Sequence, residues 1–127
     1  MREILFRGKR KKGDKRWVEG DLTHGYADYV GIVNRCCAGT SFEVVPETVG
    51  QYTGLTDKNG NKVFEHDIVK AYGSLDEISF IGVVKYFDGS FCICNPDFWI
   101  VCHLMSQDVE VIGNIHDNPE LMEGDKT

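Results

Sequence analysis

Turn-forming residues interrupt the chain so often that long helices have little room to form. The strongest turn is residues 57–61, Asp-Lys-Asn-Gly-Asn, because Asn-Gly tolerates positive φ and closes a tight hairpin. A second turn follows at residues 88–90, Asp-Gly-Ser. Between the turns lie short runs of β-branched and aromatic residues, which favour strands. The pattern predicts a mostly β fold of short antiparallel strands.

The expected strands can be placed from these runs. A hairpin is expected where residues 4–6 and 17–18 flank the polar stretch 8–16, and further strands at residues 26–33, 42–45, 68–72, 78–87, 91–94, 98–104 and 109–115. Pro46 should end one strand because proline has no N–H to donate. Strands separated by turns at intervals of about 8–12 residues are typical of a barrel or sandwich. We therefore predict a small barrel-like domain.

Helical periodicity is scarce in the sequence. The best candidate is residues 118–122, where Asn118 can cap a helix and Pro119 suits its first position. The polar tail, residues 123–127, is expected to fray. The prediction therefore includes one short C-terminal helical segment.

The length of 127 residues fits a single domain, 1–127, with one core. No apolar run approaches the roughly 20 residues that span a bilayer, and residues 1–8 lack the apolar stretch of a signal peptide. The five cysteines are an odd number, which favours reduced thiols over a disulfide framework. A cytoplasmic protein without a membrane contact is expected.

The charge is distributed unevenly along the chain. Residues 1–20 hold eight Lys and Arg against three acids, which gives this segment a net charge of +5. Because the whole chain has a net charge of −6, residues 21–127 together have a net charge of −11. The predicted hairpin at about residues 7–17 projects a basic loop that can contact phosphates, with an aromatic ring nearby for base stacking. Its candidate nucleic-acid-binding residues are Arg7, Lys9, Arg10, Lys11, Lys12, Lys15, Arg16 and Trp17.

Two observations favour a simpler role for this loop. Lysines at a hairpin also protect an exposed sheet edge from pairing with other chains. The acidic remainder of the chain would repel a polyanion unless it faces away. Nucleic-acid binding therefore stands as an alternative.

The sequence offers only weak signals for metal or catalytic chemistry. Cys92 and Cys94 with the pair Cys102 and His103 resemble a zinc set, but thiols two residues apart on a strand converge poorly, and small core side chains are the better interpretation. Neither the adjacent Cys36 and Cys37 nor the four histidines carry a local catalytic signature. Five acidic residues could suggest a divalent cation site, namely Asp57, Glu65, Asp67, Asp76 and Glu77. However, the segment 57–61 resembles the start of a calcium loop without having its terminal glutamate. We assign no catalytic residue, metal ligand or cofactor.

Three stretches together resemble the YopX family of phage and prophage proteins. The first is residues 2–7, REILFR, which is similar to the family's opening Arg-Glu-Ile-x-Phe-Arg. The central stretch comprises residues 46–55, PETVGQYTGL, with 57–60, DKNG, and 63–69, VFEHDIV. The closing stretch is residues 110–121, EVIGNIHDNPEL. One departure is His66, which stands where the family usually has glycine, so His66 must tolerate a positive φ if that glycine serves one.

The resemblance implies a barrel-like β fold with a small helical piece, encoded by a phage or prophage, and it implies no activity. We therefore expect a non-enzymatic accessory protein in the cytoplasm of a bacterial host, which works by binding an unknown host or phage protein. The alternatives are low-specificity nucleic-acid binding through the basic hairpin and, third, a metal-dependent enzyme. Small β domains rich in aromatics often complete their cores by self-association, so a homo-oligomer is expected.

Overall fold

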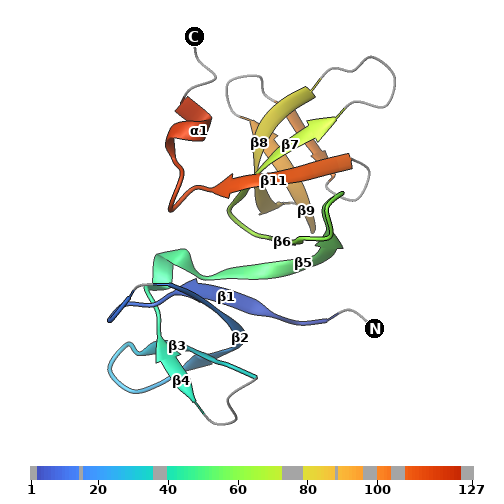
Figure 1. Ribbon diagram of the computed structural model, residues 1–127. Coiled ribbons are helices and arrows are strands. Elements are labelled where there is room, and N and C mark those ends of the chain that lie inside the picture. The colour runs from blue at the N-terminus through green and yellow to red at the C-terminus, as the bar shows by residue number, and fades with distance from the viewer. Residues whose placement is uncertain are drawn as a thin grey trace. The chain divides into compact units, whose positions relative to one another are not determined.

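The computed structural model describes residues 3–14, 16–35, 40–72, 79–87, 89–95, 100–103 and 108–123. The chain forms two compact units, residues 1–52 and 53–127 (Figure 1). Both are built from antiparallel strands, so the predicted mostly β fold is confirmed. In the described part of the chain, no helix is long and apolar enough to cross a membrane.

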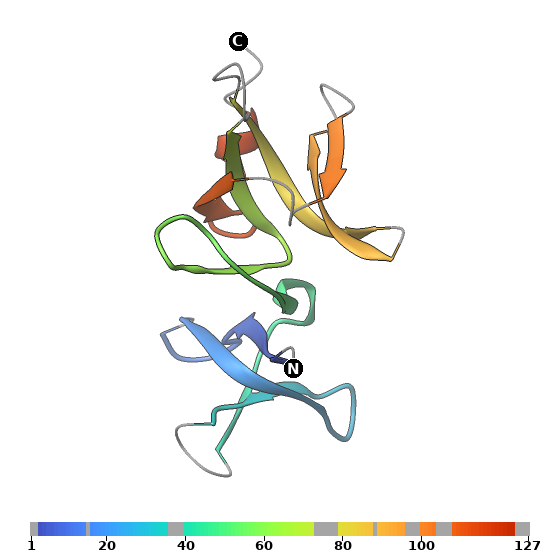
Figure 2. The ribbon, with the colours of Figure 1, turned by 90° about the vertical axis from the view of Figure 1, so that its right-hand side faces the viewer.

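The first unit contains four consecutive strands that pair in sequence order. They are β1 (Phe6–Lys9), β2 (Trp17–His24), β3 (Val30–Val33) and β4 (Ser41–Glu43). The predicted N-terminal hairpin is present, because β1 pairs with β2 in a register that sets Lys9 opposite Trp17. The loop that joins β1 to β2 and the loop that joins β2 to β3 lie at opposite ends of this unit (Figure 2).

The far end of this sheet turns back toward its first strand. Arg10 forms an isolated bridge with Val44, and the Val45 N–H donates to the Lys9 carbonyl at 2.9 Å. This curl surrounds a buried core of Val18, Ile32 and Val44. A short 3₁₀ helix, η1 (Pro46–Thr48), then follows β4, consistent with Pro46 ending the strand.

β5 (Gly50–Thr56) leads out of the first unit, where Gly50 and Gln51 pair with β1. Its second half is followed by β6 (Lys62–Phe64) across the predicted Asn-Gly turn. The Gly60 N–H donates to the Asp57 carbonyl at 3.0 Å, and Gly60 has a φ of +85°. The strand order of this first sheet is β4-β3-β2-β1-β5-β6.

The second unit is organised around a five-stranded antiparallel sheet in the order β10-β9-β8-β7-β11. Its core joins Val63, Val69, Val84, Ile93 and Val109. The strands are β7 (Asp67–Tyr72), β8 (Ser79–Phe87), β9 (Ser90–Asn95), β10 (Ile100–His103) and β11 (Asp108–Asn114), and the predicted C-terminal helical segment is present as α1 (Glu120–Glu123).

The expectation of a barrel needs correction, because the sheets formed by the described strands do not close. In the second unit, the backbone of β11 meets residues of the β5–β6 turn. The Lys58 N–H donates to the Val109 carbonyl at 3.1 Å, and the Val111 N–H donates to an Asp57 carboxylate oxygen at 3.0 Å. These bonds use backbone groups of β11 that a barrel would give to a neighbouring strand. The prediction of a single domain over residues 1–127 stays a prediction.

Candidate functional site

The predicted basic residues lie mainly in and around the loop between β1 and β2, residues 9–16, which we call the basic loop. Backbone hydrogen bonds hold both of its ends. The Arg10 N–H donates to the Arg16 carbonyl at 2.9 Å, and the Lys9 N–H donates to Thr48 Oγ1 at 2.9 Å. The loop therefore projects from a fixed base.

Acidic neighbours engage three of the loop's cations. Asp14 lies 3.4 Å from Arg10 Nη1 and 3.0 Å from Arg16 Nε. Lys11 Nζ lies 3.6 Å from a Glu43 carboxylate oxygen. Exposed pairs of this kind contribute about 0–1 kcal/mol each, so they orient the side chains more than they stabilise the fold.

Two arginines stack on aromatic rings of the same unit. The guanidinium carbon of Arg7 lies 4.8 Å from the centroid of the Trp17 ring, and that of Arg10 lies 4.7 Å from the centroid of Phe42. Both distances suit a cation–π contact. Because Arg7 covers one face of the half-buried Trp17, that face is not open to a nucleic-acid base.

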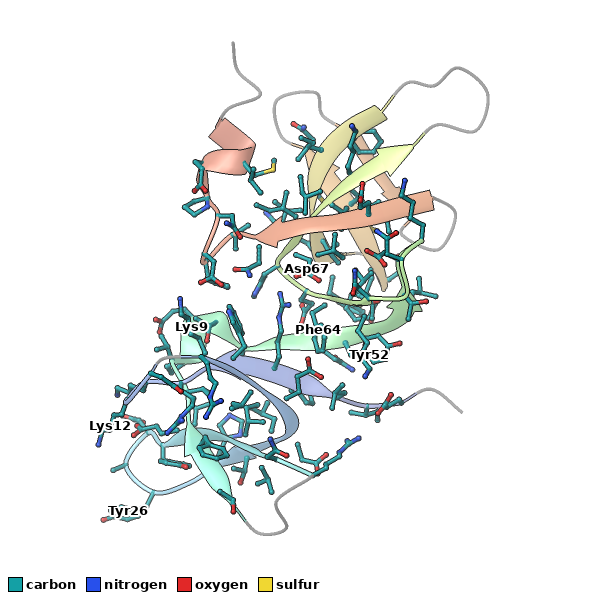
Figure 3. The ribbon with its side chains drawn as sticks, viewed as in Figure 1. Lys9, Lys12, Tyr26, Tyr52, Phe64 and Asp67 are labelled. Atoms are coloured by element: carbon teal, nitrogen blue, oxygen red, sulfur yellow. The ribbon has the colours of Figure 1, made fainter. Side chains whose placement is uncertain are left out.

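Lys12 belongs to the exposed part of the loop. It is exposed near the tip, and Figure 3 shows it at the outer edge of the first unit. Lys15, also predicted for this surface, lies outside the described residues. The structure thus brings Lys9, Arg10, Lys11, Lys12 and Arg16 to one loop and sets Arg7 and Trp17 beside its base.

Two acidic side chains of the central motif, Asp57 and Asp67, accept hydrogen bonds from backbone N–H groups. The buried Asp57 accepts hydrogen bonds from the N–H groups of Asn59, Asn61 and Val111 at 2.9, 2.8 and 3.0 Å. Burial opposes ionisation of Asp57, but these bonds outweigh it and hold its pKa below the usual range. Asp67 is also buried and accepts the Phe64 N–H at 2.8 Å. Both carboxylates therefore accept backbone hydrogen bonds, while Asp76 and Glu77 lie outside the described residues.

The two cysteines of β9 lie in or beside the core of the second unit. Cys92 is buried and Cys94 is half-buried, and both are free of disulfides. Burial, and to a lesser degree the neighbouring Cys92, raises the pKa of Cys94, which disfavours the reactive thiolate. In the pairing of β9 with β10, position 102 is in register with Ile93 and position 103 with Cys92. Cys36 and Cys37 lie outside the described residues.

Two histidines meet in the second unit, although they are 50 residues apart in sequence. His116 Nε2 lies 3.3 Å from His66 Nδ1, and both side chains are half-buried. His66 has a φ of +74°, the left-handed geometry anticipated for this position. Sequence reasoning missed the pair because no local pattern links the two positions. Among the described residues, no group of three or more His, Cys, Asp or Glu side chains forms a metal-binding cluster.

Fold and site together define a small, mostly β protein with a fixed basic loop on its first unit and backbone-bound acids in its second. Residues 5–123 match the YopX protein family, and the chain therefore belongs to that family. It is similar to protein EF1440 from Enterococcus faecalis, known from a crystal structure. The two are 27% identical with a TM-score of 0.55, and the alignment covers 96% of this chain and 99% of EF1440. No curated protein matches the chain significantly.

Proposed function

We propose that this protein is a non-catalytic binding module and that the basic loop is its contact surface for an anionic partner. The observation that carries the proposal is the placement of five cations on one loop whose two ends are hydrogen-bonded to each other and whose first residue is hydrogen-bonded to Thr48 of η1. The five are Lys9, Arg10, Lys11, Lys12 and Arg16. The chain as a whole has a net charge of −6, so this loop differs in sign from the rest of the molecule.

The geometry of the loop supports binding in two ways. Asp14 and Glu43 hold three of the cations in place, so less side-chain entropy is lost when a partner is engaged. The acidic remainder of the chain repels an anion from the other surfaces, so contact is confined to the basic loop. The first effect favours association, the second restricts where it occurs, and neither requires a chemical step.

Membership of the YopX family supports the wider biological setting of the proposal. We propose an accessory protein encoded by a phage or prophage that acts in the cytoplasm of a bacterial host. Its partner in this proposal is an acidic surface of a host or phage protein.

Low-specificity binding of nucleic acid is the second candidate, favoured by the cations along a two-stranded β-ribbon. Because Arg7 already covers a face of Trp17, contact would involve phosphates more than base stacking. Affinity should then fall steeply with salt and depend little on base sequence.

The experiment titrates fluorescently labelled probes at low and physiological salt and follows anisotropy. The probes are random-sequence single-stranded DNA, double-stranded DNA and poly-glutamate, which represents an acidic protein surface. The double variant K9E/K12E tests the loop without removing any of the three ion pairs described above. The control is Lys62→Glu, which makes the same kind of charge change at an exposed position of β6.

Under the proposal, K9E/K12E binds poly-glutamate at least tenfold more weakly than the wild type, while K62E changes little. DNA binding with the same dependence on Lys9 and Lys12 would favour the second candidate instead. Failure to bind any anionic probe at low salt would reject the basic loop as a contact surface.

A further inference from the structure

A pair of histidines in the second unit plays no part in the proposed function. His66 lies in the turn between β6 and β7, and His116 follows β11. Their ring centroids are 5.2 Å apart with an interplanar angle of 82°, so one ring meets the other edge-on. This brings two ring nitrogens within 3.3 Å of each other.

The backbone of each histidine is fixed by its own hydrogen bonds. The His66 N–H donates to the Val84 carbonyl at 2.8 Å, and the His66 carbonyl accepts the Ile115 N–H at 3.0 Å. The His116 N–H donates to Asn114 Oδ1 at 3.0 Å. The two imidazoles therefore start from anchored positions, and neither loop has to be ordered before the rings can meet.

The separation of the nitrogens matches the geometry of metal coordination. Metal–nitrogen bonds of about 2.0–2.1 Å in a tetrahedron place neighbouring ligand nitrogens roughly 3.3–3.4 Å apart. The last torsion of a histidine side chain has a broad energy minimum, so modest ring rotations can direct both lone pairs at one point. The hydrogen-bonded pair is thus close to a bidentate ligand arrangement.

We propose that His66 and His116 form an open two-histidine site for a borderline divalent transition metal ion, of the class of Zn²⁺, Co²⁺ or Ni²⁺. Imidazole nitrogen suits these ions, whereas Mg²⁺ and Ca²⁺ prefer oxygen ligands. Since the described residues supply no third His, Cys, Asp or Glu ligand, water completes the coordination.

The site is independent of the basic loop, which belongs to the other unit. It can therefore be tested without any knowledge of the binding partner.

The test titrates untagged protein with Co²⁺ and follows heat and visible absorption, with Zn²⁺ as a competitor. Absorption is also recorded in the near-ultraviolet because the chain has five cysteines, and thiolate coordination of Co²⁺ adds charge-transfer bands there that nitrogen coordination lacks. The first variant is His66→Gly, chosen because glycine accepts a φ of +74° readily and the fold is retained. The second is His116→Gln. The control is His24→Gln, which removes an exposed histidine at the end of β2.

The expected result is one bound Co²⁺ per chain without thiolate bands, displaced by Zn²⁺. Affinity should fall at least tenfold in H66G and in H116Q and stay unchanged in H24Q. Binding should also raise the Tm of the wild type, because the ion binds only the folded site. Equal affinity in the wild type and both pair variants, a thiolate spectrum, or no binding would each overturn the proposal.

Discussion

Among single residues, Asp57 connects two parts of the second unit that are far apart in sequence. Its carboxylate accepts hydrogen bonds from backbone N–H groups of its own turn and from the N–H of Val111, which lies 54 residues further along the chain. A charged acceptor suits several N–H donors because each hydrogen bond to an ionised group is stronger than a neutral one. The residue therefore ties the Asn-Gly turn to β11.

Replacing Asp57 by Asn should destabilise the protein by about 1–3 kcal/mol at neutral pH. The new amide can keep one acceptor oxygen, but its NH₂ group would leave a backbone N–H without a partner. Urea unfolding of wild type and variant measures the difference. Glu47→Gln, at an exposed acid, serves as the control and should lie within about 0.5 kcal/mol of the wild type.

The lowered pKa of Asp57 also fixes how this difference depends on pH. A carboxyl whose folded pKa lies below its unfolded value, about 3.9, stabilises the fold fully above that value. The contribution is lost as the pH falls through the folded pKa. The gap in unfolding free energy between wild type and D57N should therefore narrow below about pH 4, and a gap that widens on acidification would contradict the assignment.

Among the elements, β2 and β3 pair where a glycine allows unusually close approach. An added Cβ at Gly20 would lie 1.9 Å from the Val33 carbonyl oxygen and 2.8 Å from its carbon. Both atoms belong to the backbone, so neither can move without disturbing the pairing. This contact explains why β2 carries glycine at a buried position.

Gly20→Ala should consequently destabilise the first unit by about 3 kcal/mol or more, beyond the usual range for overpacking. The matched change is Gly60→Ala, where the φ is also positive but nothing lies within 4 Å of the added Cβ. There the cost should be only the left-handed strain of about 1–2 kcal/mol. Denaturant unfolding compares the two, and equal losses would show that the contact with Val33 does not decide the effect.

At the scale of the whole molecule, self-association stays a prediction from the aromatic content of a small β protein. Three large apolar side chains are exposed in the described residues, namely Ile4, Tyr26 and Tyr86. Light scattering after size-exclusion chromatography should give a mass that is a multiple of the 14.3 kDa chain. A mass of one chain across the accessible concentrations would contradict the prediction.

Local chemistry in the sequence determined much of this protein. The Asn-Gly turn at residues 59–60, the hairpin that displays the basic residues and the short helix after Pro119 all depend on neighbours within a few positions. The left-handed backbone at His66 agrees with the condition that the family resemblance set, namely that the glycine usual at this position serves a positive φ. Such features are predictable because turn type and strand pattern restrict φ and side-chain direction locally.

Only the tertiary structure decided the contacts between residues far apart in sequence. It left the sheets open, placed Glu43 beside Lys11, directed Asp57 to Val111 and brought His66 to His116. No periodicity connects positions 50 or more residues apart, because their separation depends on how strands pair and twist. The sequence by itself thus determined the strands, the turns and the charge of the basic loop, whereas strand pairing determined which polar side chains meet.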